Sequence, residues 1–208
     1  MPKTTKKLSE KQKMLSGALY CANDPELQSL MLHCRQVLSS FNNISNIDLA
    51  FKMKLLSKLF GKMGENCFIQ PTFRCDYGCN IEVGDNFFAN YDCIFLDVNK
   101  IKIGDNVFFA PRVCIYTAGH PIDKDVRFIQ LEYGYPVTIG NDVWVGGNVV
   151  INPGVTIGSN VVIGSGSVVT HDIPSDSVAA GVPCKVIRKI TEEDKAYWTK
   201  QKDAYFNS

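Results

Sequence analysis

Two stretches of the sequence decide the fold: IGDNVF-FAPRVC-IYTAGH at residues 103–120 and IGNDVW-VGGNVV-INPGVT at residues 139–156. Each block of six begins with an aliphatic or aromatic residue, mostly carries Gly, Ala or Asn in second place, and usually has Val in fifth place. Neither an α-helix nor a lone β-strand repeats every six residues. The period therefore predicts short strands joined by corners and stacked coil upon coil.

The first block of each coil recurs along the chain, and it can be used to count the coils. It begins at Met63, Val83, Ile103, Ile139 and Ile157, in steps of 20, 20, 36 and 18 residues. Three blocks of six make about 18 residues, so the long step contains one coil plus an insertion at residues 121–138. We predict a mainly β protein, a parallel β-helix of five coils.

The interior of such a helix is a set of stacked side chains. Ile103, Ile139 and Ile157 should form one inward ladder, and Val145 should stack on Ile163 in another. The glycines in second place are expected to adopt positive φ at the tight corners.

Helical patterns flank the repeat on both sides. Ser9 can cap a short helix that ends at Gly17, Asp24 can cap a helix that starts at Pro25, and a further amphipathic helix covers residues 48–60. Thr191 can cap a final helix, which we expect to cover the open end of the β-helix. The predicted organisation is an N-terminal helical cap at residues 1–61, the β-helix at 62–173, and a C-terminal strap and helix at 174–208.

Composition restricts the possible partners and the cellular setting. The 208 residues carry 22 basic and 21 acidic side chains, a net charge of +1, which argues against a nucleic-acid partner. No apolar run is long enough to span a membrane and no signal segment is visible, so we expect a cytoplasmic protein with reduced thiols. Cys75 and Cys79 have a spacing that zinc accepts, but no second pair accompanies them, so core packing is the better interpretation and no metal is expected.

Four segments carry a resemblance to a known family. They are APRVCIYTAGHPIDKDVR (110–127), GNDVWVGGNVVINPGVTIG (140–158), VAAGVPCKVIRKI (178–190) and KMLSGALYCANDPEL (13–27). They resemble the maltose and galactoside O-acetyltransferases, acyltransferases built on a left-handed β-helix of hexapeptide repeats. The resemblance implies the left-handed winding, a homotrimer with active sites between subunits, acetyl-CoA as donor, a small sugar as acceptor and a histidine general base.

His120 is the candidate for that base. A neutral imidazole, with an ordinary pKa near ~6.5, suits proton abstraction at neutral pH. His120 ends a coil at a surface corner, whereas His33 lies on a predicted cap helix and His171 follows the last predicted coil. Asn90 matches the family residue that stabilises the oxyanion of the tetrahedral intermediate.

The resemblance also assigns binding residues. The candidates for acceptor contact are Asp76, Asn90, Asp97 and, as an alternative to a purely capping role, Asp24. The candidates for CoA contact are Trp144, Gly147, Ser165, Thr170, His171, Lys185 and Arg188. The insertion is expected to reach a neighbouring subunit and to form a wall of the acceptor pocket.

Other functions remain open at this stage. A hexapeptide acyltransferase with a serine or antibiotic acceptor shares the same repeat, and so does a non-catalytic solenoid subunit. A zinc lyase of the γ-carbonic anhydrase kind needs three converging histidines, and only His120 is well placed. The sequence does not name the physiological sugar.

Overall fold

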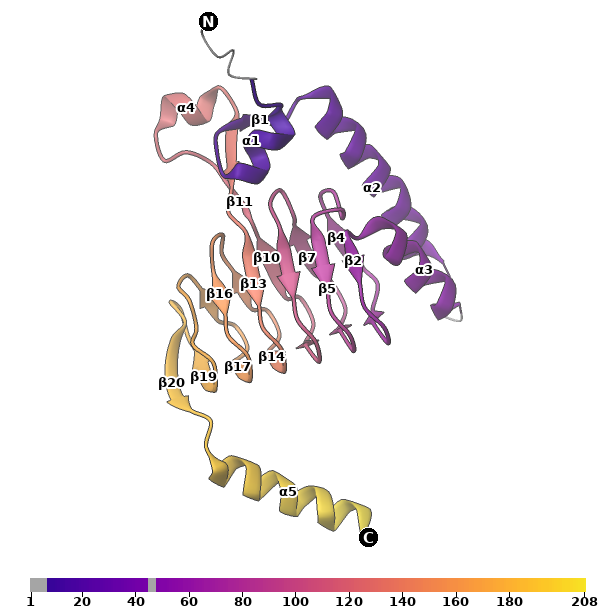
Figure 1. Ribbon diagram of the computed structural model, residues 1–208, viewed down its shortest axis with the longest axis vertical. Coiled ribbons are helices and arrows are strands. Elements are labelled where there is room, and N and C mark those ends of the chain that lie inside the picture. The colour runs from indigo at the N-terminus through magenta and orange to yellow at the C-terminus, as the bar shows by residue number, and fades with distance from the viewer. Residues whose placement is uncertain (1–6, 45–47) are drawn as a thin grey trace, which may run out of the picture.

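The computed structural model describes residues 7–44 and 48–208, so residues 1–6 and 45–47 of the predicted cap lie outside the described part. The body is a parallel β-solenoid whose coils stack side by side (Figure 1). Each coil adds one short strand to each of three faces, which gives the mainly β architecture that the repeat predicts.

The three faces are named here after their first strands. The β2 face contains β2 (Lys62–Met63), β5 (Ile81–Val83), β8 (Ile101–Ile103), β13 (Val137–Ile139) and β16 (Thr156–Ile157). The β3 face contains β3 (Phe68–Ile69), β6 (Phe88–Ala89), β9 (Phe108–Phe109), β14 (Val143–Val145), β17 (Val161–Ile163), β19 (Ser177–Ala180) and β20 (Lys185–Lys189). The β4 face contains β4 (Phe73–Cys75), β7 (Cys93–Leu96), β10 (Cys114–Tyr116), β15 (Val150–Ile151) and β18 (Val168–Val169).

The inward ladders follow the predicted register. Ile139 pairs with Ile103 on one side and Ile157 on the other, and Val145 pairs with Ile163. All five side chains are at most 5% exposed. The stacked aliphatic residues therefore form the core, as the six-residue period predicts.

The close packing of the corners explains why glycine occupies the second place of the repeat. The prediction that these glycines adopt a positive φ is wrong. Positive φ falls two residues later, for example at Asn106 (φ 57°). A Cβ on Gly104 would lie 2.1 Å from Asn141 Oδ1 and 2.8 Å from the Gly140 backbone of the next coil. Asn141 Oδ1 accepts the backbone N–H of Asp105 at 2.9 Å, so glycine is needed for the close approach of coils that this bond requires.

The solenoid continues one turn beyond the five predicted coils. Ile173 forms a parallel bridge to Ile157, and β19 pairs with β17. Ile173 and Ala179 are at most 4% exposed, so they extend the core. The first part of the predicted strap is thus a sixth coil, and β20 then pairs antiparallel with β19 at the edge of the sheet.

The predicted cap helices form at the expected positions and cover the first coils. They are α1 (Glu10–Ser16), α2 (Pro25–Asn43) and α3 (Leu49–Leu59). Ser9 and Gln12 form a capping box on α1, and Gly17 ends it with φ 80°. Asp24 accepts the first backbone N–H groups of α2, where Pro25 fits the first turn. Buried residues of α2 and α3 join the solenoid core: Cys34, Leu38, Phe41, Leu56 and Leu59.

The insertion folds back onto the N-terminal cap. β11 (Ala118–Gly119) and β12 (Leu131–Gly134) flank α4 (Lys124–Phe128), and β12 also pairs antiparallel with β1 (Tyr20–Cys21). β13 begins at Val137, so the last two residues of the predicted insertion are part of the solenoid.

The C-terminal helix α5 (Glu192–Phe206) projects away from the solenoid and buries no residue (Figure 1). The expectation that it covers the open end of the β-helix is therefore wrong. Within residues 7–44 and 48–208, no helix is long and apolar enough to cross a membrane.

Candidate active site

The predicted site residues divide between two edges of the β4 face. The Asn90 edge is the corner row that leads from the β3 face into the β4 face, and the His120 edge is the corner row at which the β4-face strands end. In coil two, Asn90 precedes β7 on the first edge and Asp97 follows it on the second. Extended chain rises about 3.3 Å per residue, so the four residues of β7 alone separate the two edges by about 10 Å or more. One chain therefore does not bring Asn90 and His120 together.

His120 lies directly after β11 and is exposed. The pairing of β11 with β12 joins Ala118 to Gly134 and Gly119 to Tyr133 and ends there, one residue before His120. Glu132 of β12 pairs with Tyr20 of β1 on the other side of the strand. The insertion therefore contributes a carboxylate on the strand next to β11, which leads to His120. Glu132 was not among the predicted site residues.

Glu132 also connects the insertion to the cap and to the first coil. The Tyr20 hydroxyl donates to Glu132 Oε2 at 2.7 Å. Burial, and after it the negative charge of Glu132, raise the pKa of Asp76 to about 6, and Arg35 opposes the shift. The predicted acceptor residue Asp76 therefore lies in the electrostatic field of Glu132.

Tyr77, next to Asp76, belongs to the same cluster. Its ring is 2% exposed and packs with Met14, Tyr20 and Leu27. Burial, Asp76 and Glu132 raise the pKa of its hydroxyl. Within the described residues this hydroxyl is the one buried side-chain oxygen that has no hydrogen-bond partner.

Asp97 is placed differently from the prediction. It is fully buried, and its carboxylate accepts the backbone N–H groups of Asp76 and Tyr77 at 2.9 Å and of Asn80 at 3.3 Å. Burial raises the pKa of Asp97 to about 7, against these hydrogen bonds. A carboxylate enclosed in this way has no surface for direct contact with an acceptor. It holds the turn that carries Asp76.

The Asn90 edge contains an apolar hollow. A cavity of about 370 Å³ is lined by Phe88, Asn90, Phe108, Phe109, Ala110 and Trp144. The Asn90 side-chain oxygen accepts the N–H of Tyr91 at 2.8 Å. That bond leaves the amide N–H₂ of Asn90 as the free donor, as an oxyanion contact requires.

The predicted CoA residues are distributed over both edges. Gly147 and Ser165 lie on the Asn90 edge, in the corners that follow β14 and β17. Thr170 and His171 follow β18 on the His120 edge, where Thr170 Oγ1 and His171 Nδ1 are 2.9 Å apart.

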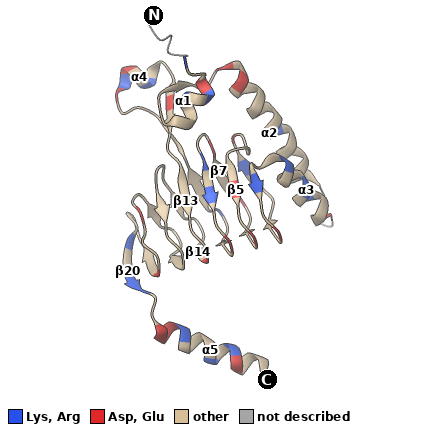
Figure 2. Cartoon of the chain, in the orientation of Figure 1, with Lys and Arg blue, Asp and Glu red and all other residues tan. Residues whose placement is uncertain are grey.

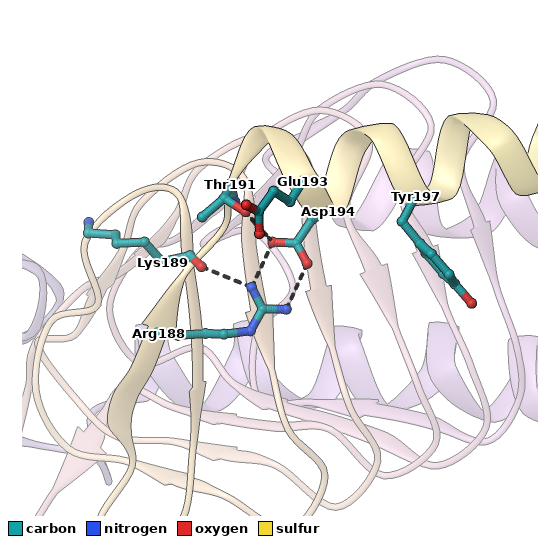
Figure 3. Close-up of a pocket in the computed structure, with 6 residues that line it drawn as sticks. All are labelled: Arg188, Lys189, Thr191, Glu193, Asp194 and Tyr197. Atoms are coloured by element: carbon teal, nitrogen blue, oxygen red, sulfur yellow. Dashed lines mark hydrogen bonds and ion pairs between the residues drawn. The ribbon is translucent and has the colours of Figure 1, made fainter.

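Two predicted CoA residues lie outside both edges, on β20. Lys185 is exposed, with no ion pair among the described residues. Arg188 is paired instead with Asp194 of α5, through Nη1 at 2.7 Å and Nη2 at 2.9 Å (Figure 3). Both guanidinium nitrogens that face Asp194 are therefore engaged, and Arg188 can contact a phosphate only if this pair opens or its remaining N–H is used.

The remaining predictions concern the cap and metal ions. Asp24 serves as the N-cap of α2, and its side chain accepts the backbone N–H groups of Glu26 and Leu27. This capping role explains the presence of an aspartate at position 24 without any contact to the acceptor substrate. In residues 7–44 and 48–208, no group of three or more His, Cys, Asp or Glu side chains could hold a metal ion.

The fold and this site define a class of protein, the hexapeptide-repeat acetyltransferases. The family model described as the maltose acetyltransferase hexapeptide capping motif matches residues 13–64, and the bacterial transferase hexapeptide model matches residues 136–171. A maltose O-acetyltransferase structure from Clostridium difficile 630 is 55% identical with a TM-score of 0.88, over 88% of this chain and 98% of that one. The galactoside acetyltransferase structure in complex with coenzyme A is 41% identical with a TM-score of 0.88, over 91% and 94%.

Curated relatives agree with these structures. The galactoside O-acetyltransferase of Escherichia coli is 42% identical over 91% of this chain and 93% of its own length. The chain belongs to the maltose and galactoside O-acetyltransferase family, and it is an acyltransferase.

Proposed function

We propose that this enzyme transfers the acetyl group of acetyl-CoA to a hydroxyl group of a sugar, in sites formed between the subunits of a cytoplasmic homotrimer. The observation that carries the proposal is the separation of the candidate residues onto two edges of the β4 face. One edge carries a potential base and carboxylates, and the other carries an amide donor and an apolar hollow. Each half lacks what the other supplies, so apposition of the two edges from neighbouring copies completes a site.

The acceptor half performs the proton transfer. The His120 imidazole takes the proton of the acceptor hydroxyl while the hydroxyl oxygen attacks the thioester carbonyl carbon. Glu132 of β12, the strand that pairs with β11, is the carboxylate that stabilises the imidazolium that forms. Asp76, held by Asp97, is the carboxylate best placed to accept hydrogen bonds from other sugar hydroxyls.

The donor half stabilises the intermediate. Attack turns the carbonyl oxygen into an oxyanion, which the free amide N–H₂ of Asn90 can bind. The intermediate collapses by breaking the C–S bond, and the imidazolium returns its proton to the CoA thiolate. Trp144 offers an apolar wall for the pantetheine arm, and Lys185 offers a charge for a CoA phosphate.

Two comparisons support the donor and the acceptor class. The galactoside acetyltransferase structure contains coenzyme A, and a hexapeptide-repeat acetyltransferase structure from Vibrio cholerae contains acetyl coenzyme A, at 36% identity and a TM-score of 0.83. The relatives named for their acceptors act on maltose and galactosides. We extend both properties to this chain.

The insertion is part of the same proposal. Ile122 and Phe128 are 95% and 86% exposed, and Ile129 is 63% exposed. We propose that these apolar side chains contact a neighbouring subunit and close its acceptor pocket, as the length of the insertion predicts.

A thiol-release assay with acetyl-CoA tests the function. The acceptor panel contains glucosides, galactosides, maltose, amino sugars and serine. Turnover with at least one sugar is expected, and turnover with serine alone would overturn the sugar assignment. His120→Ala should lower turnover by several hundredfold or more, because a positioned base contributes roughly 10²–10⁴-fold.

The matched control is His33→Ala, since His33 is exposed on α2 and lies outside both edges. Near-normal turnover by His120→Ala, with the same oligomeric mass as the wild type, would exclude His120 as the base.

A further inference from the structure

Two helices of the described chain bury no residue: the five-residue α4 and the fifteen-residue α5. The helix α5 nevertheless carries four large aromatic side chains, which are 57–76% exposed: Tyr197, Trp198, Tyr205 and Phe206. Large apolar surfaces that stay in water are uncommon in soluble proteins and mark interaction sites. A lone helix of this length is also marginal in water without tertiary packing.

The four aromatic residues form two pairs on one side of the helix. Tyr197 and Trp198 have ring centroids 5.0 Å apart, and those of Tyr205 and Phe206 are 5.2 Å apart. Trp198 and Tyr205 are seven positions apart, which is close to two helical turns of about 3.6 residues, so they share one stripe of the helix. Tyr197 and Phe206 flank this stripe on its two sides. The four side chains together cover about half of the helix circumference and are called the aromatic face.

The base of α5 is held in place against β20 and the sixth coil, where Tyr197 borders a cavity with Arg188 and Trp198 borders one with Asp176. The Asp194 carboxylate accepts the two hydrogen bonds from Arg188 and a third from the Thr191 backbone N–H at 2.9 Å (Figure 3). The Ile190 N–H donates to the Asp176 carbonyl of the sixth coil at 2.9 Å. In the described part of the chain, Asp194 is the only α5 side chain that bonds to residues outside the helix.

We propose that α5 is an assembly arm, which docks its aromatic face onto a second copy of this chain. The inference goes beyond the proposed chemistry and needs from it only that the chain self-associates. The arm is about 22 Å long, at 1.5 Å per residue, and in Figure 1 it runs from beneath β20 back in the direction of the earlier turns. That length matches the height of between four and five coils at about 4.8 Å each, so the arm can lie along a neighbouring solenoid.

The chain offers a receiving surface of the same chemistry. Phe68, Phe88 and Phe108 pair in register along the outside of the β3 face, with ring centroids 6.0 and 6.4 Å apart. Phe108 is 50% exposed, and it borders the cavity at the Asn90 edge. Aromatic side chains from a neighbouring arm can pack edge to face against this column.

Area and charge favour a second copy over other partners. An aromatic side chain buries about 200 Å², so four that are more than half exposed offer roughly 500 Å². With an equal area on the receiving copy, the contact approaches the ~1,000 Å² that a specific interface requires. The arm carries four acidic and three basic residues along its length (Figure 2), whereas helices that bind membranes or nucleic acids are rich in Lys and Arg.

A charge substitution on each side of the helix tests the proposal in the full-length protein. Trp198→Glu places a carboxylate in the aromatic face, and Ala196→Glu places the same charge on the opposite, exposed side. Light scattering after gel filtration measures the mass over a dilution series. We expect Trp198→Glu to dissociate at a protein concentration at least tenfold higher than the wild type, and Ala196→Glu to match the wild type. Equal dissociation of all three proteins, or a wild type that is monomeric at every concentration, would overturn the proposal.

Fluorescence supplies a second measurement that does not depend on mass. Trp144 and Trp198 are the two tryptophans of the chain, so Trp144→Phe leaves Trp198 as the single emitter. Its emission should be blue-shifted when the protein is assembled and red-shifted after dilution. Emission typical of an exposed indole in the assembled protein would contradict docking. Thiol release is followed in parallel on Ala196→Glu, which keeps Trp144: absence of acetyl transfer with normal assembly would count against the proposed function and not against the arm.

Discussion

Replacing Tyr77 with phenylalanine should stabilise the protein, although the tyrosine lies in a packed core. Its hydroxyl is buried, and among the described residues it has no hydrogen-bond partner. A buried polar group without a partner costs about 1–3 kcal/mol of folding free energy. Deleting the oxygen removes that cost and sacrifices only a few weak contacts, because the ring stays in place. We expect a net gain of about 1 kcal/mol.

The control is the neighbouring phenol, Tyr20. It is fully buried as well, but its hydroxyl donates to Glu132 at 2.7 Å. Hydrogen bonds to a charged group contribute about 1.5–3 kcal/mol, so Tyr20→Phe should destabilise the protein by about 2 kcal/mol. The same atom is removed in both variants, and only the presence of a partner differs.

Thermal unfolding at one fixed protein concentration measures both changes, since self-association makes the midpoint depend on concentration. For a chain of this size, 1 kcal/mol corresponds to about 2–4 °C in Tm. Tyr77→Phe should therefore melt about 2–4 °C above the wild type and Tyr20→Phe below it. A drop in Tm for Tyr77→Phe that matches the drop for Tyr20→Phe would refute the reasoning, because the Tyr77 hydroxyl would then have a partner of its own.

Two further predictions concern pH and the corners. Burial raises the pKa of Asp97 to about 7, above its value of about 3.9 in an unfolded chain, so the protonated carboxyl favours the folded state. Relative to Asp97→Asn, the wild type should lose stability as the pH rises from about 4 to about 7, by up to ~1.4 kcal/mol per pH unit. Urea unfolding midpoints of both proteins at about pH 5 and pH 8 measure this loss. A difference in stability between the two proteins that does not change with pH would contradict the prediction. Gly104→Ala should lower the Tm more than Gly147→Ala does, because a Cβ at Gly104 meets Asn141 Oδ1 at 2.1 Å whereas the nearest atom to a Cβ at Gly147 is 3.2 Å away, and neither glycine has a positive φ. Equal Tm values would show that the corner adjusts to the added methyl group.

The parts of the fold that depend on local patterns could be predicted from the sequence. The inward ladder of Ile103, Ile139 and Ile157 follows from the six-residue period, because each coil pairs only with its neighbours. The caps at Ser9 and Asp24 follow from a polar side chain placed directly before a helix. The sixth coil was not predicted because Ile173 follows Ile157 by 16 residues. This step is shorter than the 18 residues of three blocks of six, although the Ile173 side chain still stacks on the coil before it.

The parts of the site that depend on contacts between distant segments could not be predicted in this way. The place of Glu132 on the strand next to β11 results from an antiparallel pairing inside an insertion that has no repeat. The enclosure of Asp97 results from three backbone N–H groups of the preceding coil, and the pairing of Arg188 depends on the direction in which α5 leaves β20. The resemblance assigned roles to Asp97 and Arg188 but carried no information on which side chains are already engaged.

The corner bonds have a consequence for how this enzyme family can diversify. Asp85 donates its N–H to Asp105 at 2.8 Å across 20 residues, and Asp105 donates to Asn141 at 2.9 Å across 36. The stack therefore closes equally well whether or not a long excursion intervenes. At that junction, evolution or an engineer can exchange the inserted segment beside the acceptor substrate without changing the fold of the solenoid that holds the donor substrate.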